Sequence, residues 1–490
     1  MSVKSRLQLL HAELLKRILD EAFELIATLG VKVASPEAQE LLAKADARVQ
    51  EGIAQIPKSL ALRALDSVPK EFFLYSRSGQ PAVRYGGENV QFDPGSSCLN
   101  ILDSETQQAR PAVSSDLVRM VQVAEALPEY AAQSTAMVCN DVPSEIGDWY
   151  RLLLVLWHSD KPIVTGAFSA QTLQIMFELL AADSGGMEAL QQRPRAIFDV
   201  CPSPPLNWSE FASQNLVELA RAGVPAEMVS MPLAGATAPV TLAGAIVQHA
   251  AECLSGITIH QLAKPGAPIV WGGAPAIFDM SNGNAPMGAI ETAMLDAGCA
   301  QVGKSLGLPT HGYLVASDAR QIDAQAGMES GASAIVGALA GIDMISGAGM
   351  LDFLACHSIE KLVIDAEAIA SAQRLINGIE SQTDPLVLGM FAQTGLHGDF
   401  LKLKETRALF RKEQHFPSSV IDRGGDSGGD IVSRARQRVD ALLRDYHAPA
   451  IPSETRKLLV STATRHARAA GLNRLPGIEF AESFVTTGEY

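Results

Sequence analysis

From about residue 115, short apolar segments alternate with longer segments of helical periodicity. The apolar segments, interpreted as strands, are 131–139, 162–166, 196–201, 227–231, 268–272, 310–315 and 343–346. The helical patterns that follow them cover 144–158, 170–182, 208–222, 239–263, 286–306, 321–340 and 358–379. Apolar strands that alternate with helices of roughly 10–20 residues indicate βαβ units and a parallel sheet.

This rhythm constrains the architecture to two parallel folds. Seven such units within about 250 residues fit a (β/α)8 barrel, the TIM barrel. An open doubly wound sheet is the alternative. The eighth strand of a barrel is not obvious from the pattern, and we expect it at 362–364, at 386–390 or within 90–101.

The flanking regions differ in character from the barrel and suggest a three-part chain. We expect helices and a β-hairpin that pack on the barrel in residues 1–115, the barrel core in 116–380, and a helical extension in 381–490. The hairpin is expected between 72–83 and 90–101, which are separated by two glycines.

The amino-terminal helices carry recognisable boundary signals. Residues 11–29 repeat apolar side chains at helical spacing, and Gly30 stands where a glycine ends a helix. Ser35 and Pro36 then suit the cap and first position of a second helix.

Charge and cysteine content narrow the function classes. The chain carries 54 acidic and 39 basic residues, a net charge of −15, which disfavours nucleic acid and anionic membrane surfaces as partners. Its 6 cysteines form no CxxC pair, which is typical of a reduced, intracellular protein. Neither a secretory signal nor an apolar run of about 20 residues is evident, so we expect a cytoplasmic protein without a membrane span.

Common cofactor and metal motifs are missing from the sequence. There is no GxGxxG, no GxxxxGK[ST] and no HExxH, and the 10 histidines form no ligand cluster. We therefore expect no metal and no tightly bound cofactor in this chain.

The functional site of a parallel barrel lies at the carboxyl ends of its strands. Small residues dominate the segments that follow the predicted strands, and they let a large flat ligand or a partner approach the backbone closely. The glycines proposed for such docking are Gly235, Gly272, Gly347 and Gly349.

Polar and aromatic side chains at the same ends are the candidates for substrate binding. Trp271 and Tyr313 are aromatic residues that can stack on a cation. Asp318 can serve as a cation partner or as a helix cap. The remaining candidates are Met231, Thr237, Glu291, Asp323, Gln325 and His357.

One long stretch carries a family resemblance. Residues 231–273 read MPLAGATAPVTLAGAIVQHAAECLSGITIHQLAKPGAPIVWGG, which resembles the trimethylamine methyltransferase family, the catalytic subunits of corrinoid-dependent methylamine methyltransferases. Supporting stretches are 26–30, 56–57, 160–162, 317–319, 323–326, 341–349 and 358–365. The resemblance covers nearly the whole chain and is weakest after about residue 450.

The resemblance implies a (β/α)8 barrel that moves a methyl group from a methylated amine to Co(I) of a corrinoid on a separate protein. Trimethylamine-specific members carry pyrrolysine, whereas every residue here is one of the standard twenty. The chain therefore resembles the branch that demethylates quaternary amines such as glycine betaine. A quaternary ammonium is already a usable leaving group, so the reaction needs mainly alignment and no general base.

Applied to this sequence, the resemblance places the quaternary amine in the barrel mouth. Its charge is expected against Trp271 or Tyr313 and against Asp318 or Asp323, with the corrinoid protein docked over the mouth. Two alternatives remain open, namely a barrel enzyme of other lyase or transferase chemistry and a non-catalytic protein that binds quaternary amines. The apolar fraction of 47% is compatible with a homo-oligomer.

Overall fold

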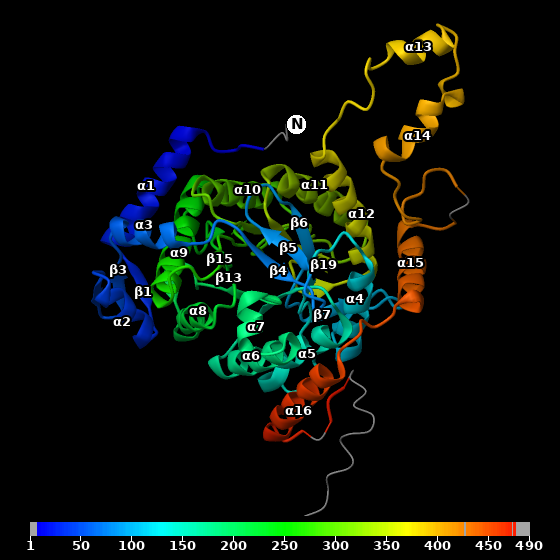
Figure 1. Cartoon of the computed structure of the whole chain (residues 1–490). Helices are drawn as coiled ribbons and strands as arrows, with labels where there is room; N and C mark the ends of the chain where they lie inside the picture. The colour runs from blue at the N-terminus through cyan, green and yellow to red at the C-terminus, as the bar shows by residue number, and fades with distance from the viewer. Residues whose placement is uncertain (1–6, 426–427, 473, 477–490) are drawn as a thin grey trace, which may run out of the picture.

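Eight parallel strands form a closed barrel at the centre of the computed structural model, which describes residues 7–425, 428–472 and 474–476 (Figure 1). One sheet has the order β15-β13-β11-β10-β9 and another the order β17-β18-β6. Parallel bridges from Trp271 to Thr310 and from Cys98 to Met137 join the two sheets at both edges. The strands are β6 (Gln91–Pro94), β9 (Gln133–Ser134), β10 (Ile163–Gly166), β11 (Ala196–Val200), β13 (Ala226–Met228), β15 (Ile269–Val270), β17 (His311–Tyr313) and β18 (Met344–Ala348).

The barrel confirms the predicted fold and excludes the doubly wound alternative. The barrel strand that the sequence pattern does not single out is β6, which precedes the other seven and pairs in parallel with β18. The two other expected places are wrong, because 362–364 lies in α12 and 388–390 begins α13. The three-part division stays a prediction, and β6 falls on the amino-terminal side of its first boundary.

Eight helices follow the strands and pack around the ring. They are α4 (Ser114–Ala126), α5 (Gly147–His158), α6 (Ala170–Ser184), α8 (Glu210–Ala222), α9 (Leu242–Ala263), α10 (Ile290–Ser305), α11 (Ala324–Ala340) and α12 (Ile359–Ile376). Among the residues that the structure describes, α9 alone has the length and apolar composition to cross a bilayer, but most of it is buried inside the protein. Its apolar sequence thus fits a core helix.

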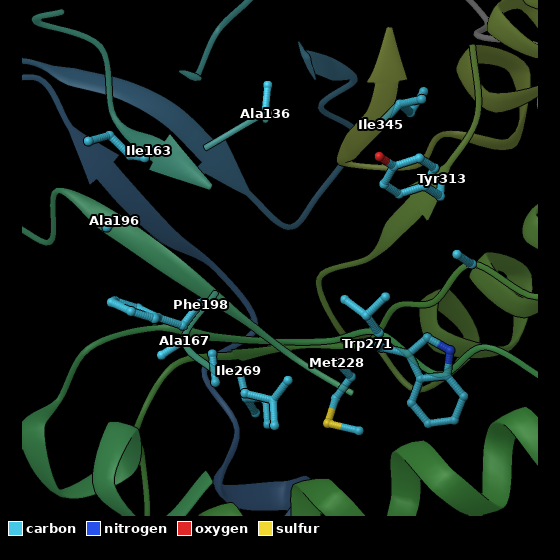
Figure 2. Close-up of a cluster of buried hydrophobic side chains, with 14 of the residues drawn as sticks. Ala136, Ile163, Ala167, Ala196, Phe198, Met228, Ile269, Trp271, Tyr313 and Ile345 are labelled. Atoms are coloured by element: carbon cyan, nitrogen blue, oxygen red, sulfur yellow. The ribbon is translucent and has the colours of Figure 1, made fainter. Parts of the chain in front are cut away.

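Side chains alternate along the barrel strands, which separates the hydrophobic core from a polar interior. Phe198 on β11 contacts Phe177 of α6 edge to face, and Met228 on β13 reaches Gly256 of α9. Both belong to the buried apolar layer between strands and helices (Figure 2). Their neighbours Asp199 and Glu227 consequently point into the barrel, because successive side chains on a strand face opposite sides.

The predicted hairpin exists, but its second strand is a different segment. β4 (Phe72–Tyr75) pairs antiparallel with β5 (Pro81–Tyr85), and residues 91–94 join the barrel instead. Leu74, Val83 and Tyr85 pack against the first residues of several barrel strands, so the hairpin covers the amino-terminal end of the barrel. The apolar pattern indicates short strands without specifying their partners, which explains the wrong pairing.

The amino-terminal elements rest on α9 and confirm the predicted helix boundaries. They are α1 (Ala12–Thr28), α2 (Pro36–Lys44), α3 (Lys58–Ser67) and the short strands β1 (Val31–Val33), β2 (Arg48–Gln50) and β3 (Ile53–Gln55). Ser35 caps α2 by accepting a hydrogen bond from the Ala38 amide. Gly30 has a φ of 80°, and a side chain there would meet the Ala54 carbonyl oxygen.

Two small sheets stand at the carboxyl ends of the barrel strands. β7 (Asn100–Leu102), β8 (Ala109–Pro111), β19 (Met350–Leu351) and β20 (Cys356–His357) form one, and β14 (Leu233–Ala234) with β16 (Ala276–Ile277) forms the other. Between α6 and β11 lies the short α7 (Met187–Gln192), and β12 (Asn207–Trp208) pairs with β1.

The carboxyl-terminal part consists of helices. α15 (Ile431–Asp445) packs on α4 and α12, and α16 (Ser453–Ala469) packs on α6. Before them, α13 (Leu388–Thr394) and α14 (Lys404–Glu413) form an arm that projects from the body, drawn in yellow and orange in Figure 1.

Candidate active site

A cavity of about 270 Å³ lies at the carboxyl ends of the strands. Three aromatic side chains form much of its wall. Phe168 comes from the loop after β10, Phe211 from the first turn of α8, and Tyr313 from the end of β17. The remaining wall is chiefly small or apolar, so the cavity suits a compact ligand with an apolar exterior.

Tyr313 is held rigidly in this wall. Its hydroxyl oxygen accepts a hydrogen bond of 2.7 Å from the Ser96 amide, and the residue is buried. Burial raises the pKa of its phenol, which keeps the ring neutral. A fixed, neutral aromatic face is the kind of surface on which an ammonium group stacks.

Asp199 supplies the carboxylate of the cavity. It stands on β11, points into the barrel and lines the cavity floor. Burial raises the pKa of Asp199 to about 7, and a hydrogen bond with Glu227 acts in the opposite direction. Asp199 is therefore poised to change its charge when a cation enters.

Glu227 connects this floor to the barrel interior. It is fully buried, and the Tyr85 hydroxyl donates a 3.0 Å hydrogen bond to its Oε2. Burial and the nearby Asp199 raise the pKa of Glu227 well above its usual range. Two carboxyl groups this close cannot both ionise at low cost, so the pair holds at most one negative charge near neutral pH.

Further polar side chains continue this row of neighbouring polar groups across the barrel interior. His311 Nδ1 lies 3.4 Å from Glu227 Oε1, and His311 Nε2 lies 3.0 Å from the Ser346 hydroxyl. Ser346 in turn donates a 2.6 Å hydrogen bond to Asp93. Burial lowers the pKa of His311 to about 3 and raises that of Asp93, so this interior stays largely uncharged.

Two of the predicted substrate-binding residues, Met231 and Tyr313, line the cavity. Trp271 faces the helices, where its Nε1 donates a 3.0 Å hydrogen bond to the Cys299 carbonyl of α10. Figure 2 shows Trp271 in the buried apolar layer with Met228. Its ring is fully buried there and lines no part of the cavity.

The predicted acidic candidates lie around the mouth without meeting in the cavity. Asp318 accepts hydrogen bonds from the Met287 and Gly288 amides, and burial raises its pKa to about 6. The cap of α11 is Asp323, which accepts from the Ala326 amide. Glu291 is exposed in the first turn of α10.

The other polar candidates make contacts within the chain. Gln325 donates to Glu329 at 2.8 Å on the exposed side of α11, and Thr237 accepts from the Leu233 amide. His357 is fully buried behind the mouth, where burial lowers its pKa to about 3. None of these three lines the cavity.

The predicted docking glycines serve mainly close packing inside the chain. Gly347 has a φ of 121°, and a side chain there would overlap the Leu314 carbonyl. Gly349 and Gly272 lie directly against His357 and His311, respectively, and all three glycines are buried. Gly235 is half-buried beside Met280.

Exposed apolar side chains instead surround the mouth. They belong to the loops that follow the strands and to the second turn of α11, and each is at least 64% exposed: Phe168, Val240, Met280 and Met328. An apolar rim on a mouth of this kind is typical of a surface that another protein covers.

Sequence reasoning missed the residues that define the cavity, above all Asp199, Glu227, Phe168 and Phe211. A signal was present for the acids, since each interrupts an otherwise apolar strand, as in AIFDV and AEM. An acid in a buried strand is costly unless it serves a purpose. Within the described ranges, no group of three or more histidine, cysteine or acidic residues could hold a metal ion.

Comparison with known proteins agrees with this geometry. The sequence model described as "Trimethylamine methyltransferase (MTTB)" matches residues 2–470. The trimethylamine methyltransferase MttB2 of Methanosarcina mazei is 31% identical over 486 residues, which cover 94% of this chain and 96% of that protein. The glycine betaine methyltransferase of Desulfitobacterium hafniense is 25% identical over 452 residues, covering 91% and 94%.

The solved structure of the monomethylamine methyltransferase MtmB from Methanosarcina barkeri is also similar. It aligns over 90% of both chains with a TM-score of 0.53 and 14% sequence identity. At that identity the likeness concerns the fold alone.

Proposed function

Because the chain belongs to the trimethylamine methyltransferase family and is a methyltransferase, we propose that it moves a methyl group from a quaternary, betaine-like amine to Co(I) of a corrinoid on a separate protein. The observation that carries the proposal is a cavity with three aromatic walls that closes on one carboxylate, Asp199. Aromatic faces and a carboxylate are the two groups that bind a quaternary ammonium, which has no hydrogen to donate. We place the protein in the cytoplasm.

The charge of the cavity favours a cation over an anion. Asp199 is the only charged residue among the described residues that line it. A guanidinium stands one layer behind, because Arg151 lies over the Phe168 ring at 5.8 Å and donates to the Ser97 hydroxyl at 3.3 Å. Asp148 pairs with this guanidinium at 3.2 Å, so Arg151 adds little net charge to the wall and the cavity keeps its preference for a cation.

The residues of this chain hold and orient the substrate and exclude water from it. Phe211 and Tyr313 contact the methyl groups, and ionised Asp199 balances the charge on nitrogen. After the methyl group has left, the amine is neutral and no longer balances Asp199. The raised pKa of Asp199 then favours its protonation, which weakens the hold on the product.

A corrinoid carried by the partner protein would supply the nucleophile, Co(I). Nothing in the reaction requires a general base from this chain, because the amine leaves as a neutral molecule. The apolar rim of Phe168, Val240, Met280 and Met328 is the surface on which the corrinoid protein would dock.

Turnover with a panel of amines tests this function. The purified chain is mixed with Co(I) cobalamin and glycine betaine, carnitine, proline betaine, choline or trimethylamine, and methylation of cobalamin is followed by its absorption spectrum. We expect methylation with at least one quaternary amine and none with trimethylamine. Binding of a quaternary amine without methylation, even with the cognate corrinoid protein, would favour the non-catalytic alternative.

A further inference from the structure

The wall of the cavity contains a buried amide whose oxygen is unpaired. Asn215 lies in the second turn of α8, four residues after Phe211, so both side chains share the face of α8 that lines the cavity. Asn215 is only 3% exposed, yet its Oδ1 has no hydrogen-bond partner in the described part of the chain. The other buried residues of α8 are mostly apolar, among them Leu216, Val217 and Leu219.

The orientation of this amide is set by its nitrogen. Asn215 Nδ2 donates to the Ala167 carbonyl oxygen at 3.4 Å. The reverse orientation would set Oδ1 against that carbonyl oxygen, where two acceptors repel each other. An unpaired buried acceptor is unfavourable, and an apolar residue of similar size would fill the position without that cost. Asn215 therefore keeps a hydrogen-bond acceptor in the cavity wall at the expense of stability.

Two unpaired acceptors of different charge thus line the cavity. Asp199 Oδ1 and Asn215 Oδ1 are the two buried side-chain atoms without a hydrogen bond among the described residues of its wall. In the proposed function the Asp199 carboxylate balances the ammonium group, which has no hydrogen to donate. The neutral Asn215 oxygen remains for a neutral donor elsewhere on the ligand. A hydroxyl group is such a donor, whereas a carboxylate at this point would be repelled by the amide oxygen.

We propose that Asn215 determines substrate specificity, because its Oδ1 accepts a hydrogen bond from a hydroxyl group on the quaternary amine. Phe211 and Asn215 lie on one face of α8, so the ring stacks on the ammonium group while the amide binds a hydroxyl a short linker away. A site built around a hydroxyl rejects an analogue that lacks it, since the acceptor is then left unpaired. The inference rests on the proposed function and names a substrate class within it, namely quaternary amines that bear a hydroxyl group.

Calorimetric titration of the full chain with matched ligands tests this role. Choline and ethyltrimethylammonium have the same ammonium head, and only choline carries a hydroxyl group. In (2-fluoroethyl)trimethylammonium a fluorine of similar size replaces the hydroxyl and cannot donate a hydrogen bond. We expect wild type to bind choline at least about fivefold more tightly than either analogue, because each analogue leaves the buried Asn215 oxygen unpaired.

Two substitutions at this position separate the acceptor from the shape of the wall. Asn215→Leu removes the acceptor at similar volume, and we expect it to bind choline and ethyltrimethylammonium with similar affinity. Asn215→Asp keeps an oxygen acceptor at the same point and should keep the preference for choline. Asn100→Leu is the matched control and should also keep it. Asn100 is a half-buried amide on β7 that donates to the Ala355 carbonyl at 3.3 Å and lines no part of the cavity.

Equal affinity of wild type for choline and both analogues would overturn the proposal, and this comparison needs no variant that could fail to fold. A preference for choline that survives Asn215→Leu would overturn it as well. So would an equal loss of all three ligands in Asn215→Leu, because Asn215 would then only support the wall. These outcomes leave the proposed function standing. That function fails separately, when no quaternary amine transfers a methyl group in the turnover assay.

Discussion

Replacing Asp199 by asparagine tests two effects of this carboxyl group: its contribution to binding a quaternary amine and the stability that its burial costs. The substitution keeps the shape of the side chain and removes its charge. Truncating one partner of a buried charge pair costs roughly 2–5 kcal/mol. Because one side of Asp199 faces the cavity, we expect the substitution to lose about 2–3 kcal/mol of binding free energy. This loss weakens binding of a quaternary amine roughly 30- to 150-fold.

The same carboxyl group should make wild-type binding depend on pH. The pKa of Asp199 is about 7, so a proton competes with the cation below that pH. We expect the affinity of wild type to fall about tenfold per pH unit below pH 7 and to level off above it. The affinity of Asp199→Asn should show little change over this range.

The free energy of unfolding should fall as pH rises, whereas the affinity for the amine should increase. The pKa of Asp199 is raised from 3.8 to about 7, so its favourable contribution is present below pH 3.8 and is lost as pH rises through 7. Full burial would cost at most about 4 kcal/mol at pH 8, and partial exposure to the cavity reduces this to about 1–3 kcal/mol. Asp199→Asn should therefore unfold at a higher temperature than wild type at pH 8 and show less advantage at pH 5.

Calorimetric titration with choline and with its neutral isostere 3,3-dimethylbutanol is the assay. Wild type should prefer choline, and Asp199→Asn should lose most of that preference. Asp318→Asn is the matched control, because Asp318 is also a partly buried acid at the mouth but lines no part of the cavity. Equal choline affinity in wild type and Asp199→Asn would refute the reasoning.

Three further substitutions test other parts of the site. Phe211→Ala removes one aromatic wall, and we expect choline affinity to fall roughly 2- to 30-fold, a loss of about 0.5–2 kcal/mol, with an unchanged pH profile; an equal loss of 3,3-dimethylbutanol affinity would contradict a cation–π role. Trp271→Phe loses the hydrogen bond to Cys299, so unfolding in denaturant should become about 1 kcal/mol easier while choline affinity stays the same; a selective loss of affinity would restore Trp271 as a binding residue. Gly347→Ala places a side chain against the Leu314 carbonyl at positive φ, which should destabilise the fold by about 1–3 kcal/mol in thermal unfolding; a variant as stable as wild type would show that the turn can relax.

The sequence predicts the barrel because its signal is repeated and local. Seven apolar segments separated by helical patterns specify βαβ units, whatever the exact boundaries. The first strand, Gln91–Pro94, lies within one of the three places expected for the eighth strand, but the sequence does not single it out, because four residues next to a hairpin carry no periodicity of their own. Its identity depends on pairing with Met344–Ala348, some 250 residues away, and this pairing exists only in the folded chain.

The site is predicted less well, for a reason that Trp271 and Asp199 illustrate. Both lie near the end of a strand, where the barrel rule places functional residues. Which one faces the cavity depends on the alternation of side chains, and an error of one residue in the strand reverses every direction. Trp271 consequently belongs to the layer under the helices and Asp199 to the cavity. Gly272, Gly347 and Gly349 stand at strand ends, and their burial follows from packing against His311, Leu314 and His357.

Transfer of a labelled methyl group tests the central claim most directly. Glycine betaine with 13C in its N-methyl groups is mixed with the purified chain and an equimolar amount of the cognate corrinoid protein in its Co(I) state. Nuclear magnetic resonance then locates the label. We predict one labelled methyl on cobalt and one molecule of dimethylglycine for each corrinoid, with much slower transfer by Asp199→Asn. Label that stays on the amine, with this substrate and with the other quaternary amines of the panel, would contradict the proposed function.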